Sequence, residues 1–119
     1  MTDATTPHGC LFCKIVKQEI PAQIVYEDSA CIAFRDINPQ APVHVLVVPR
    51  RHFSSAGAAD ESDEPILGHL HRVAAQIAQQ HHLSAGHRVV MNTGAAAGQT
   101  VFHVHLHVLG GRSFTWPPG

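Results

Sequence analysis

The sequence predicts an α+β domain in which a mainly antiparallel five-stranded sheet carries one long and one short helix. Three observations lead to this prediction. Two stretches have the apolar spacing of amphipathic helices, short strand-like runs lie between turn signals, and the connections between these runs are short. The 119 residues suit one domain, so we expect a flexible lead over residues 1–9 and a single domain over residues 10–119.

The first half of the chain supplies the short helix and three strands. Residues 10–20 have one apolar helical side, and Pro21 requires this helix to stop before it. Residues 23–28 and 31–36 alternate as strands around a short turn, which predicts a hairpin. Residues 43–48 are apolar on both faces apart from one histidine, as expected of a central strand that is covered on both sides.

The second half supplies the long helix and two more strands. In residues 65–80, apolar side chains recur at helical steps, and acidic residues precede the first turn, where the helix dipole favours them. Residues 87–92 have the composition of a strand, and residues 93–100 form a loop of small residues. The last strand is predicted over residues 101–108, with the sequence VFHVHLHV.

The composition argues against several kinds of partner and location. The chain has 8 Lys and Arg against 9 Asp and Glu, so no excess of positive charge favours nucleic acid or an anionic membrane. Its longest apolar runs are far shorter than the roughly 20 residues of a membrane-spanning helix. The N-terminal MTDATTPHG lacks the charged and then apolar build of a signal peptide, so we expect a cytoplasmic protein.

The most informative stretch is the last strand, where histidine occupies every second position. Because side chains alternate between the faces of a strand, His103, His105 and His107 are expected on one face. Three interpretations are open: a solvated, pH-sensitive face, three ligands of a catalytic zinc, or one nucleophilic histidine assisted by its neighbours. Like-facing neighbours on one strand fan out along a line, which disfavours three ligands on one metal.

The loop before this strand favours the third interpretation. Asn92, the backbone N–H groups around Gly94 and Gly98, and the hydroxyl of Thr100 suit the oxygens of a phosphate. A neutral imidazole is a good nucleophile near pH 7 when its second nitrogen keeps its proton. Its attack on phosphorus would give a covalent intermediate and so divide hydrolysis into two easier steps.

Several segments resemble a known family. HVHLHVL, from residue 103 to residue 109, resembles the motif of the histidine triad superfamily of nucleotide-binding hydrolases and transferases. AFRDINPQAPVHVLVVPRRH, GQTVFHVHLHVLGGR and the tail GGRSFTWPPG resemble in particular the Hint branch, the adenosine phosphoramidate hydrolases also described as protein kinase C-interacting proteins. The likeness runs from about Cys10 to Gly119, and it implies the histidine triad fold, extended across a homodimer.

The resemblance implies a role for each matching residue. His105 would attack the α-phosphorus of an adenylyl group, with His44 near the scissile bond and Asp36 on the ribose hydroxyls. The phosphate oxygens would be held by Asn92, Gly98, Thr100 and His107. The apolar slot for the purine would be formed by Leu11, Phe12, Ile15, Phe34 and Ile37. Trp116 would reach toward the site of the neighbouring subunit.

The resemblance also implies a metal. In the zinc-binding branches of the superfamily, the ligands are a Cys-x-x-Cys near the start, a histidine just after the central strand and the first triad histidine. These positions are held here by Cys10, Cys13, His52 and His103. This set suits one structural zinc per chain in a closed four-ligand site. The alternative is that Cys10 and Cys13 are unpaired or redox-active thiols.

The sequence therefore predicts an enzyme, a purine nucleoside phosphoramidase or nucleotidyl hydrolase that releases AMP from AMP-linked substrates. A dinucleoside polyphosphate hydrolase or a nucleotidyl transferase is the nearest alternative, because both share the triad and differ only on the leaving-group side. An alternative of another class is an AMP-binding interaction module whose turnover is incidental.

Overall fold

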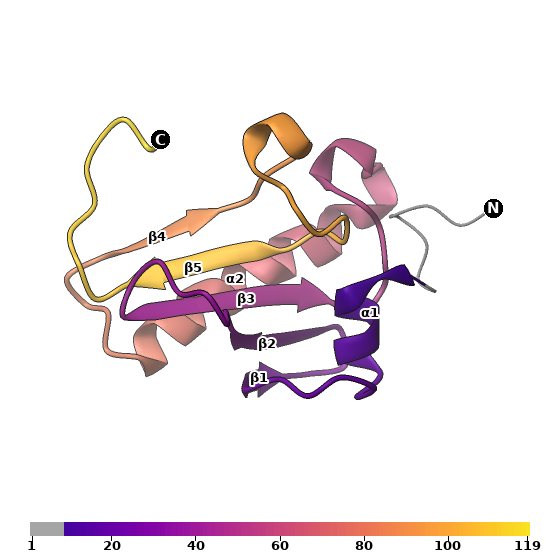
Figure 1. The fold of residues 1–119 in the computed structure, drawn as a ribbon, viewed down its shortest axis with the longest axis horizontal. Coiled ribbons are helices and arrows are strands. Elements are labelled where there is room, and N and C mark those ends of the chain that lie inside the picture. Colours follow the sequence, from indigo (N-terminus) through magenta and orange to yellow (C-terminus); the bar gives the residue numbers. More distant parts are fainter. Residues whose placement is uncertain (1–8) are drawn as a thin grey trace.

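The computed structural model describes residues 9–119, so the predicted lead lies, apart from Gly9, outside the described residues. Its strands form one sheet and are β1 (Ile24–Glu27), β2 (Cys31–Arg35), β3 (Val43–Pro49), β4 (His87–Val90) and β5 (Leu106–Gly110). The order across this 5-stranded sheet is β1-β2-β3-β5-β4, and every neighbouring pair is antiparallel (Figure 1). The predicted fold class is thus confirmed.

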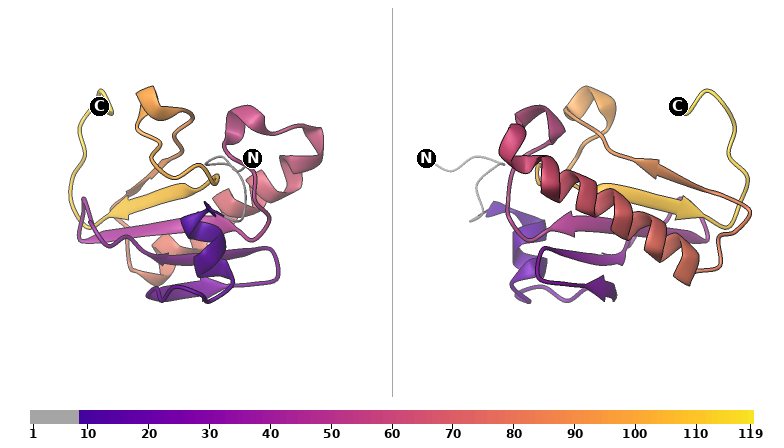
Figure 2. Two further views of the ribbon diagram at one scale, coloured as in Figure 1. Left: turned by 45° about the vertical axis from the view of Figure 1, so that its right-hand side comes forward. Right: turned by 180° about the vertical axis from the view of Figure 1, so that it is seen from behind.

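Two α-helices cover opposite faces of this sheet (Figures 1 and 2). The short helix α1 (Leu11–Val16) lies on one face, and the long helix α2 (Glu64–Gln80) crosses the other. Short 3₁₀ turns occur at Ala56–Ala58, Glu61–Asp63 and Ala95–Ala97. Within residues 9–119, no helix has both the length and the apolar character needed to cross a lipid bilayer.

The central strands bury side chains on both faces, as predicted for residues 43–48. One apolar cluster joins the sheet to α2 and includes Ala33, Val45, Val47, Leu70, Val73, Ile77, Leu106 and Val108. A second cluster joins the sheet to α1 and includes Phe12, Ile15, Ile32, Phe34, Leu46 and Val48. Alternate residues of β2 and β3 therefore serve different cores, which explains why neither strand has a polar face.

The short helix ends earlier than predicted. It stops at Val16, Gln18 takes a left-handed φ of 63°, and the N–H of Glu19 donates to the carbonyl of Lys14 over 2.8 Å. Bonds of this kind satisfy the last carbonyls of a helix and reverse the chain. The prediction of a helix up to residue 20 is therefore wrong, because a local left-handed turn closes the helix before proline can.

The last strand is also shorter than predicted. β5 begins at Leu106, so His107 is the only triad histidine inside it, and residues 101–105 are irregular. The N–H of Val104 donates over 2.8 Å to the carbonyl of Phe53, in the segment that follows β3, rather than to β3 itself. The backbone partner of Val104 is thus in a loop, and the alternation of one strand-like segment could not reveal this.

Candidate functional site

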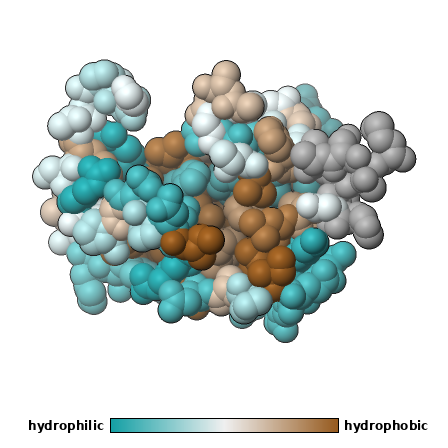
Figure 3. All heavy atoms as spheres, viewed as in Figure 1, coloured by the Kyte–Doolittle hydropathy of each residue, from teal (hydrophilic) through white to brown (hydrophobic). Residues whose placement is uncertain are grey.

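A pocket of about 350 Å³ opens between α1, the end of β2 and the triad segment. Most residues predicted to bind a nucleotide line it, namely Leu11, Phe12, Ile15, Phe34, Asp36, Ile37, Thr100, His105 and His107. Apolar side chains gather on this face of the molecule over α1 (Figure 3). The pocket therefore combines an apolar wall with a histidine end.

Sequence reasoning missed part of the wall. The additional lining residues are Ile20, Pro21, Ala22, Arg35, Leu46 and Val101. Most of them belong to irregular segments, whose side chains have no helical or strand period that could assign them to a face. Leu46 lies in β3, and only the packing of α1 on the sheet shows that it reaches this pocket.

Other predicted residues lie beside the pocket or away from it. β4 ends at Val90, so Asn92 belongs to the following loop, where its amide nitrogen lies 3.7 Å from the position of a Cβ added to Gly98. Gly98 has a φ of +100°, a conformation that favours glycine. Trp116 is 82% exposed and does not line the pocket of its own chain. Figure 1 shows the C-terminal end beyond β4, at the other end of the molecule in this view from α1.

The ring of His105 is held in one orientation. Its Nδ1 lies 2.7 Å from the carbonyl oxygen of His103, and a carbonyl can only accept, so Nδ1 carries the proton. Phe12 packs edge-on against the ring, with 5.0 Å between centroids. Burial lowers the pKa of His105, against the opposing effect of the His103 carbonyl. The ring is therefore neutral near pH 7, with the lone pair on Nε2.

His107 and His44 form a hydrogen-bonded pair with defined tautomers. The backbone N–H of Gln40 donates to His44 Nδ1 over 3.0 Å, so the neutral His44 ring carries its proton on Nε2. His44 Nε2 lies 2.9 Å from His107 Nδ1 and donates to it. His107 consequently carries its own proton on Nε2. Burial lowers the pKa of both rings, that of His107 to about 4.

The four predicted metal ligands converge at one point. The ligand atoms of Cys10, Cys13, His52 and His103 all lie within 4.8 Å of one another. His103 Nδ1 is 3.3 Å from Cys10 Sγ, 3.5 Å from Cys13 Sγ and 3.1 Å from His52 Nδ1. The other nitrogen of His103, Nε2, donates to the carbonyl of Pro49 over 2.8 Å. Nδ1 therefore presents a lone pair to the cluster, as a metal ligand must.

The chemistry of this donor set fits a tetrahedral metal such as zinc. Two thiols and two imidazoles meet in a mostly buried position, and burial followed by the neighbouring Cys10 raises the pKa of Cys13 to about 12. A bound cation would supply the positive charge that thiolates require. Asp36, His44 and His107 also lie close together. Because the Gln40 N–H donates to His44 Nδ1, the neutral ring carries its proton on Nε2, the nitrogen that faces His107, and Nε2 has no lone pair for a metal.

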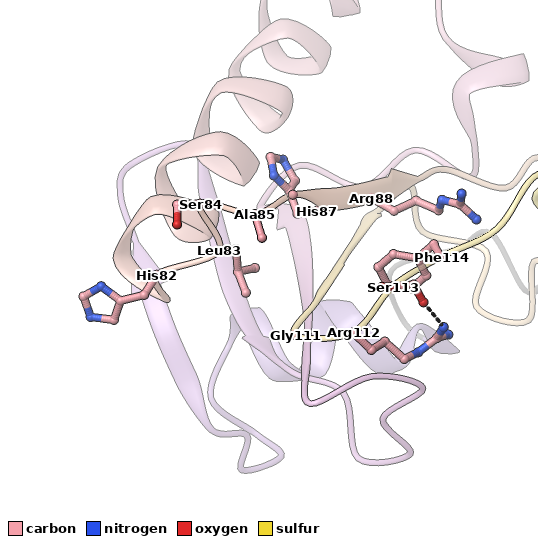
Figure 4. Close-up of a pocket in the computed structure, with 11 residues that line it drawn as sticks. His82, Leu83, Ser84, Ala85, His87, Arg88, Gly111, Arg112, Ser113 and Phe114 are labelled. Atoms are coloured by element: carbon pink, nitrogen blue, oxygen red, sulfur yellow. Dashed lines mark hydrogen bonds between the residues drawn. The ribbon is translucent and has the colours of Figure 1, made fainter.

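A larger pocket, of about 670 Å³, lies at the other end of β4 and β5 between residues 82–88 and 111–114 (Figure 4). None of the predicted catalytic residues lines it. Arg88 and Arg112 both stack on Phe114, with Cζ 5.0 and 4.3 Å from the ring centroid, and both donate to main-chain carbonyls. These contacts hold the C-terminal segment, so the smaller pocket remains the candidate active site.

Comparison with known proteins identifies the family of the chain. Residues 9–115 match the family model described as scavenger mRNA decapping enzyme C-term binding. An uncharacterized HIT-like protein of Synechocystis is 53% identical over 109 residues, which cover 92% of this chain and 96% of that protein. The chain belongs to the histidine triad family.

Solved structures agree with this membership. The histidine triad (HIT) family hydrolase from Legionella pneumophila has a TM-score of 0.91 and 47% identity, covering 92% of this chain and 99% of that one. The HIT family hydrolase from Clostridium thermocellum has a TM-score of 0.89 and 46% identity, with 92% and 96% covered. The histidine triad fold of the chain is therefore shared along nearly its full length.

Proposed function

We propose that this histidine triad protein is a purine nucleoside phosphoramidase or nucleotidyl hydrolase with His105 as its nucleophile. The observation that carries the proposal is the 2.7 Å contact between His105 Nδ1 and the His103 carbonyl. This contact directs the lone pair of Nε2 away from the backbone, in a ring that lines the pocket. Two neighbours are described as HIT family hydrolases, which supports a hydrolase.

The proposed reaction has two steps. His105 Nε2 forms a bond to the α-phosphorus, and the bond to the leaving group breaks with its electron pair, which takes up a proton from solvent. Water then attacks phosphorus and loses a proton to solvent, AMP leaves, and the electron pair of the N–P bond returns to His105 Nε2. The Nε2–H of His107, the Thr100 hydroxyl, Asn92 and the backbone at Gly98 would hold the phosphate oxygens.

The rest of the pocket suits a purine nucleoside. The apolar wall from α1 and β2 would hold the base, and the carboxylate of Asp36 would accept from the ribose hydroxyls. A structure from Candida albicans, 30% identical, is described as a histidine triad nucleotide-binding protein, which supports a nucleotide ligand. We assign the protein to the Hint branch because its tail ends in Trp-Pro-Pro-Gly.

The proposal includes a structural zinc held by Cys10, Cys13, His52 and His103. When bound, the metal would connect α1 and the segment after β3 to the residue two positions before His105. Four protein ligands leave no position for water, so the zinc would act on stability and orientation rather than on the chemical step.

The test is intact-mass analysis of protein mixed rapidly with an adenosine phosphoramidate. We expect the wild type to gain the mass of an adenylyl group and then release AMP, whereas His105→Ala gains none, because the nucleophile is gone. His71→Ala, an exposed position on α2, is the matched control and should behave as wild type. Absence of both adduct and AMP in the wild type would overturn the proposal.

Parallel substrates separate the alternatives. A diadenosine polyphosphate tests the dinucleoside polyphosphate hydrolase, and an mRNA cap analogue is added because the family model is described as belonging to an mRNA decapping enzyme. Faster adduct formation with these substrates than with the phosphoramidate would favour that class. An AMP-binding interaction module with incidental turnover would instead keep its biological role in His105→Ala, although this variant forms no adduct.

A further inference from the structure

Gln99 is a buried polar residue in the loop that precedes the triad. Its exposed fraction is 3%, whereas its neighbours Gly98 and Thr100 are exposed. Burial of a primary amide is unfavourable unless its donors and acceptor find partners. The loop between β4 and β5 therefore turns the polar side chain of Gln99 inward, while the next residue, Thr100, lines the pocket.

The side chain of Gln99 has partners on three segments. Its Oε1 accepts from the N–H of Gly94 over 2.9 Å, and its Nε2 donates to the carbonyls of Ser54 and Val101 over 2.7 and 3.1 Å. Its backbone N–H also donates to the carbonyl of Gly94 over 3.1 Å. Because two carbonyls face Nε2 and an N–H faces Oε1, the orientation of the amide is determined.

The segment of residues 52–54 supports both halves of the site. His52 meets His103 in the cysteine and histidine cluster, and the carbonyl of Phe53 accepts from the N–H of Val104. The next carbonyl, that of Ser54, accepts from Gln99. One short segment thus contacts the two residues that precede His105 and, through Gln99, the loop that supplies Thr100 to the same pocket.

Within the loop, backbone hydrogen bonds close only the short 3₁₀ turn at Ala95–Ala97, and a glycine stands on each side of this turn. Gly94 and Gly98 have φ angles of +92° and +100°, and glycine is the residue with the widest choice of backbone conformations. A Cβ on Gly57 would lie 2.9 Å from the side chain of Thr93, so the region after residue 54 approaches the loop closely. Without the amide of Gln99, the segment from Gly94 to Gly98 would lose its links to Ser54 and Val101.

We propose that Gln99 is a positioning residue that holds Asn92, the Gly98 backbone and Thr100 at the correct distance from His105 for the phosphate of the substrate. Gln99 does not line the pocket, so it acts through the loop rather than on the substrate. The inference rests on the proposed function, because it assigns the phosphate to that loop.

Two substitutions test the inference. Gln99→Glu keeps the shape but replaces both N–H donors with an oxygen that faces two carbonyls, and Gln99→Met keeps the length without polar atoms. We expect each to weaken AMP binding about tenfold and to lower kcat/KM at least as much, because the loop groups lose their position. The backbone amide of Gly94 should exchange its hydrogen with solvent faster in Gln99→Met, because the oxygen that accepts from it is removed.

Ile77→Val is the control for a merely structural effect. Ile77 is fully buried in the cluster beneath α2, away from the pocket, so this variant loses stability without touching the loop. At a temperature well below every unfolding midpoint, Ile77→Val should bind AMP as the wild type does. Gln99 variants that bind AMP and turn over substrate within twofold of the wild type would overturn the inference. A wild type that neither binds AMP nor forms an adduct would instead overturn the proposed function, and this inference with it.

Discussion

His103, His105 and His107 share one residue type and one spacing, but their nitrogens face different partners. His103 donates through Nε2 to Pro49, whereas His105 donates through Nδ1 to the carbonyl of His103. His107 instead accepts at Nδ1 from His44. The hydrogen-bond partner of each ring thus decides which nitrogen carries the proton and which keeps a lone pair, and this determines the chemistry that the ring can perform.

The pKa of His107 leads to a prediction about stability at acidic pH. Burial, then the neighbouring His105 and His44, lower this pKa to about 4, while Asp36 opposes them. The unfolded chain, with an ordinary histidine pKa of about 6.5, binds this proton at a higher pH than the folded chain does. The contribution of His107 to the free energy of unfolding is therefore constant above this pH and falls as the pH decreases toward 4. We expect a decrease of up to about 1.4 kcal/mol per pH unit from this residue.

Urea unfolding of the wild type and His107→Gln between pH 4.5 and 7.5 measures this effect. The variant should show a shallower decrease with acid, because it cannot take up the proton. His71→Gln, exposed on α2, should keep the slope of the wild type. Equal slopes for the wild type and His107→Gln would contradict the prediction.

At the scale of elements, α1 depends on tertiary contacts. Its 6 residues are too few for a helix that is stable alone, so packing must hold it. Cys10, before its first turn, and Cys13, within it, belong to the metal-ligand cluster, while Phe12 and Ile15 belong to the apolar cluster on β2 and β3. Because the same helix forms a wall of the pocket, its attachment also shapes this pocket.

The proposed zinc gives a prediction for this element. Protein purified without chelator should contain about one zinc per chain, and Cys10→Ser should lose it together with on the order of 3 kcal/mol of unfolding free energy. At a temperature where Cys10→Ser is still folded, its rate of adduct formation should stay close to that of the wild type, because the metal is not part of the reaction. Metal analysis and thermal unfolding check both points.

Cys31 supplies a matched control. It is a fully buried cysteine in β2, outside the proposed zinc ligands, so Cys31→Ala should lower stability while the protein keeps its zinc. A wild type that contains no zinc would contradict the metal assignment without affecting the role of His105.

At the scale of the whole molecule, Trp116 and the pocket of the same chain lie apart. The residue is 82% exposed, and the C-terminal end lies beyond β4, at the other end of the view from α1 (Figure 1). β4, at an edge of the sheet, leaves one row of backbone groups without a strand partner within the described residues. We therefore keep the homodimer, with Trp116 serving the neighbouring site, as a proposal.

Complementation between two variants tests the dimer. We expect sedimentation to give twice the 12.9 kDa chain mass and Trp116→Ala to lower activity several-fold. Chains with His105→Ala and chains with Trp116→Ala, mixed and refolded together, should recover about a quarter of wild-type activity, because one site per heterodimer is complete. Activity equal to the average of the separately refolded variants would show that Trp116 acts in its own chain or not at all.

Much of the architecture follows from local patterns. The alternation of residues 43–48 and the helical spacing of residues 65–80 predict the central strand and the long helix, because burial imposes a period on each element. The triad spacing also predicts that His103, His105 and His107 lie near one another, and the ring contact of His105 with His107 agrees, with 4.9 Å between centroids.

Other features depend on contacts that no local pattern contains. The sequence by itself determined the fold class, the two faces of the sheet and which side chains are candidates for the chemistry, because these follow from periodicity and residue type. Only the tertiary structure decided where β5 begins, which nitrogen of each histidine is free, and that Gln99 binds Ser54, 45 positions earlier in the chain. The reason is physical: hydrogen-bond partners are set by distance in space, which the order of residues along a chain does not specify.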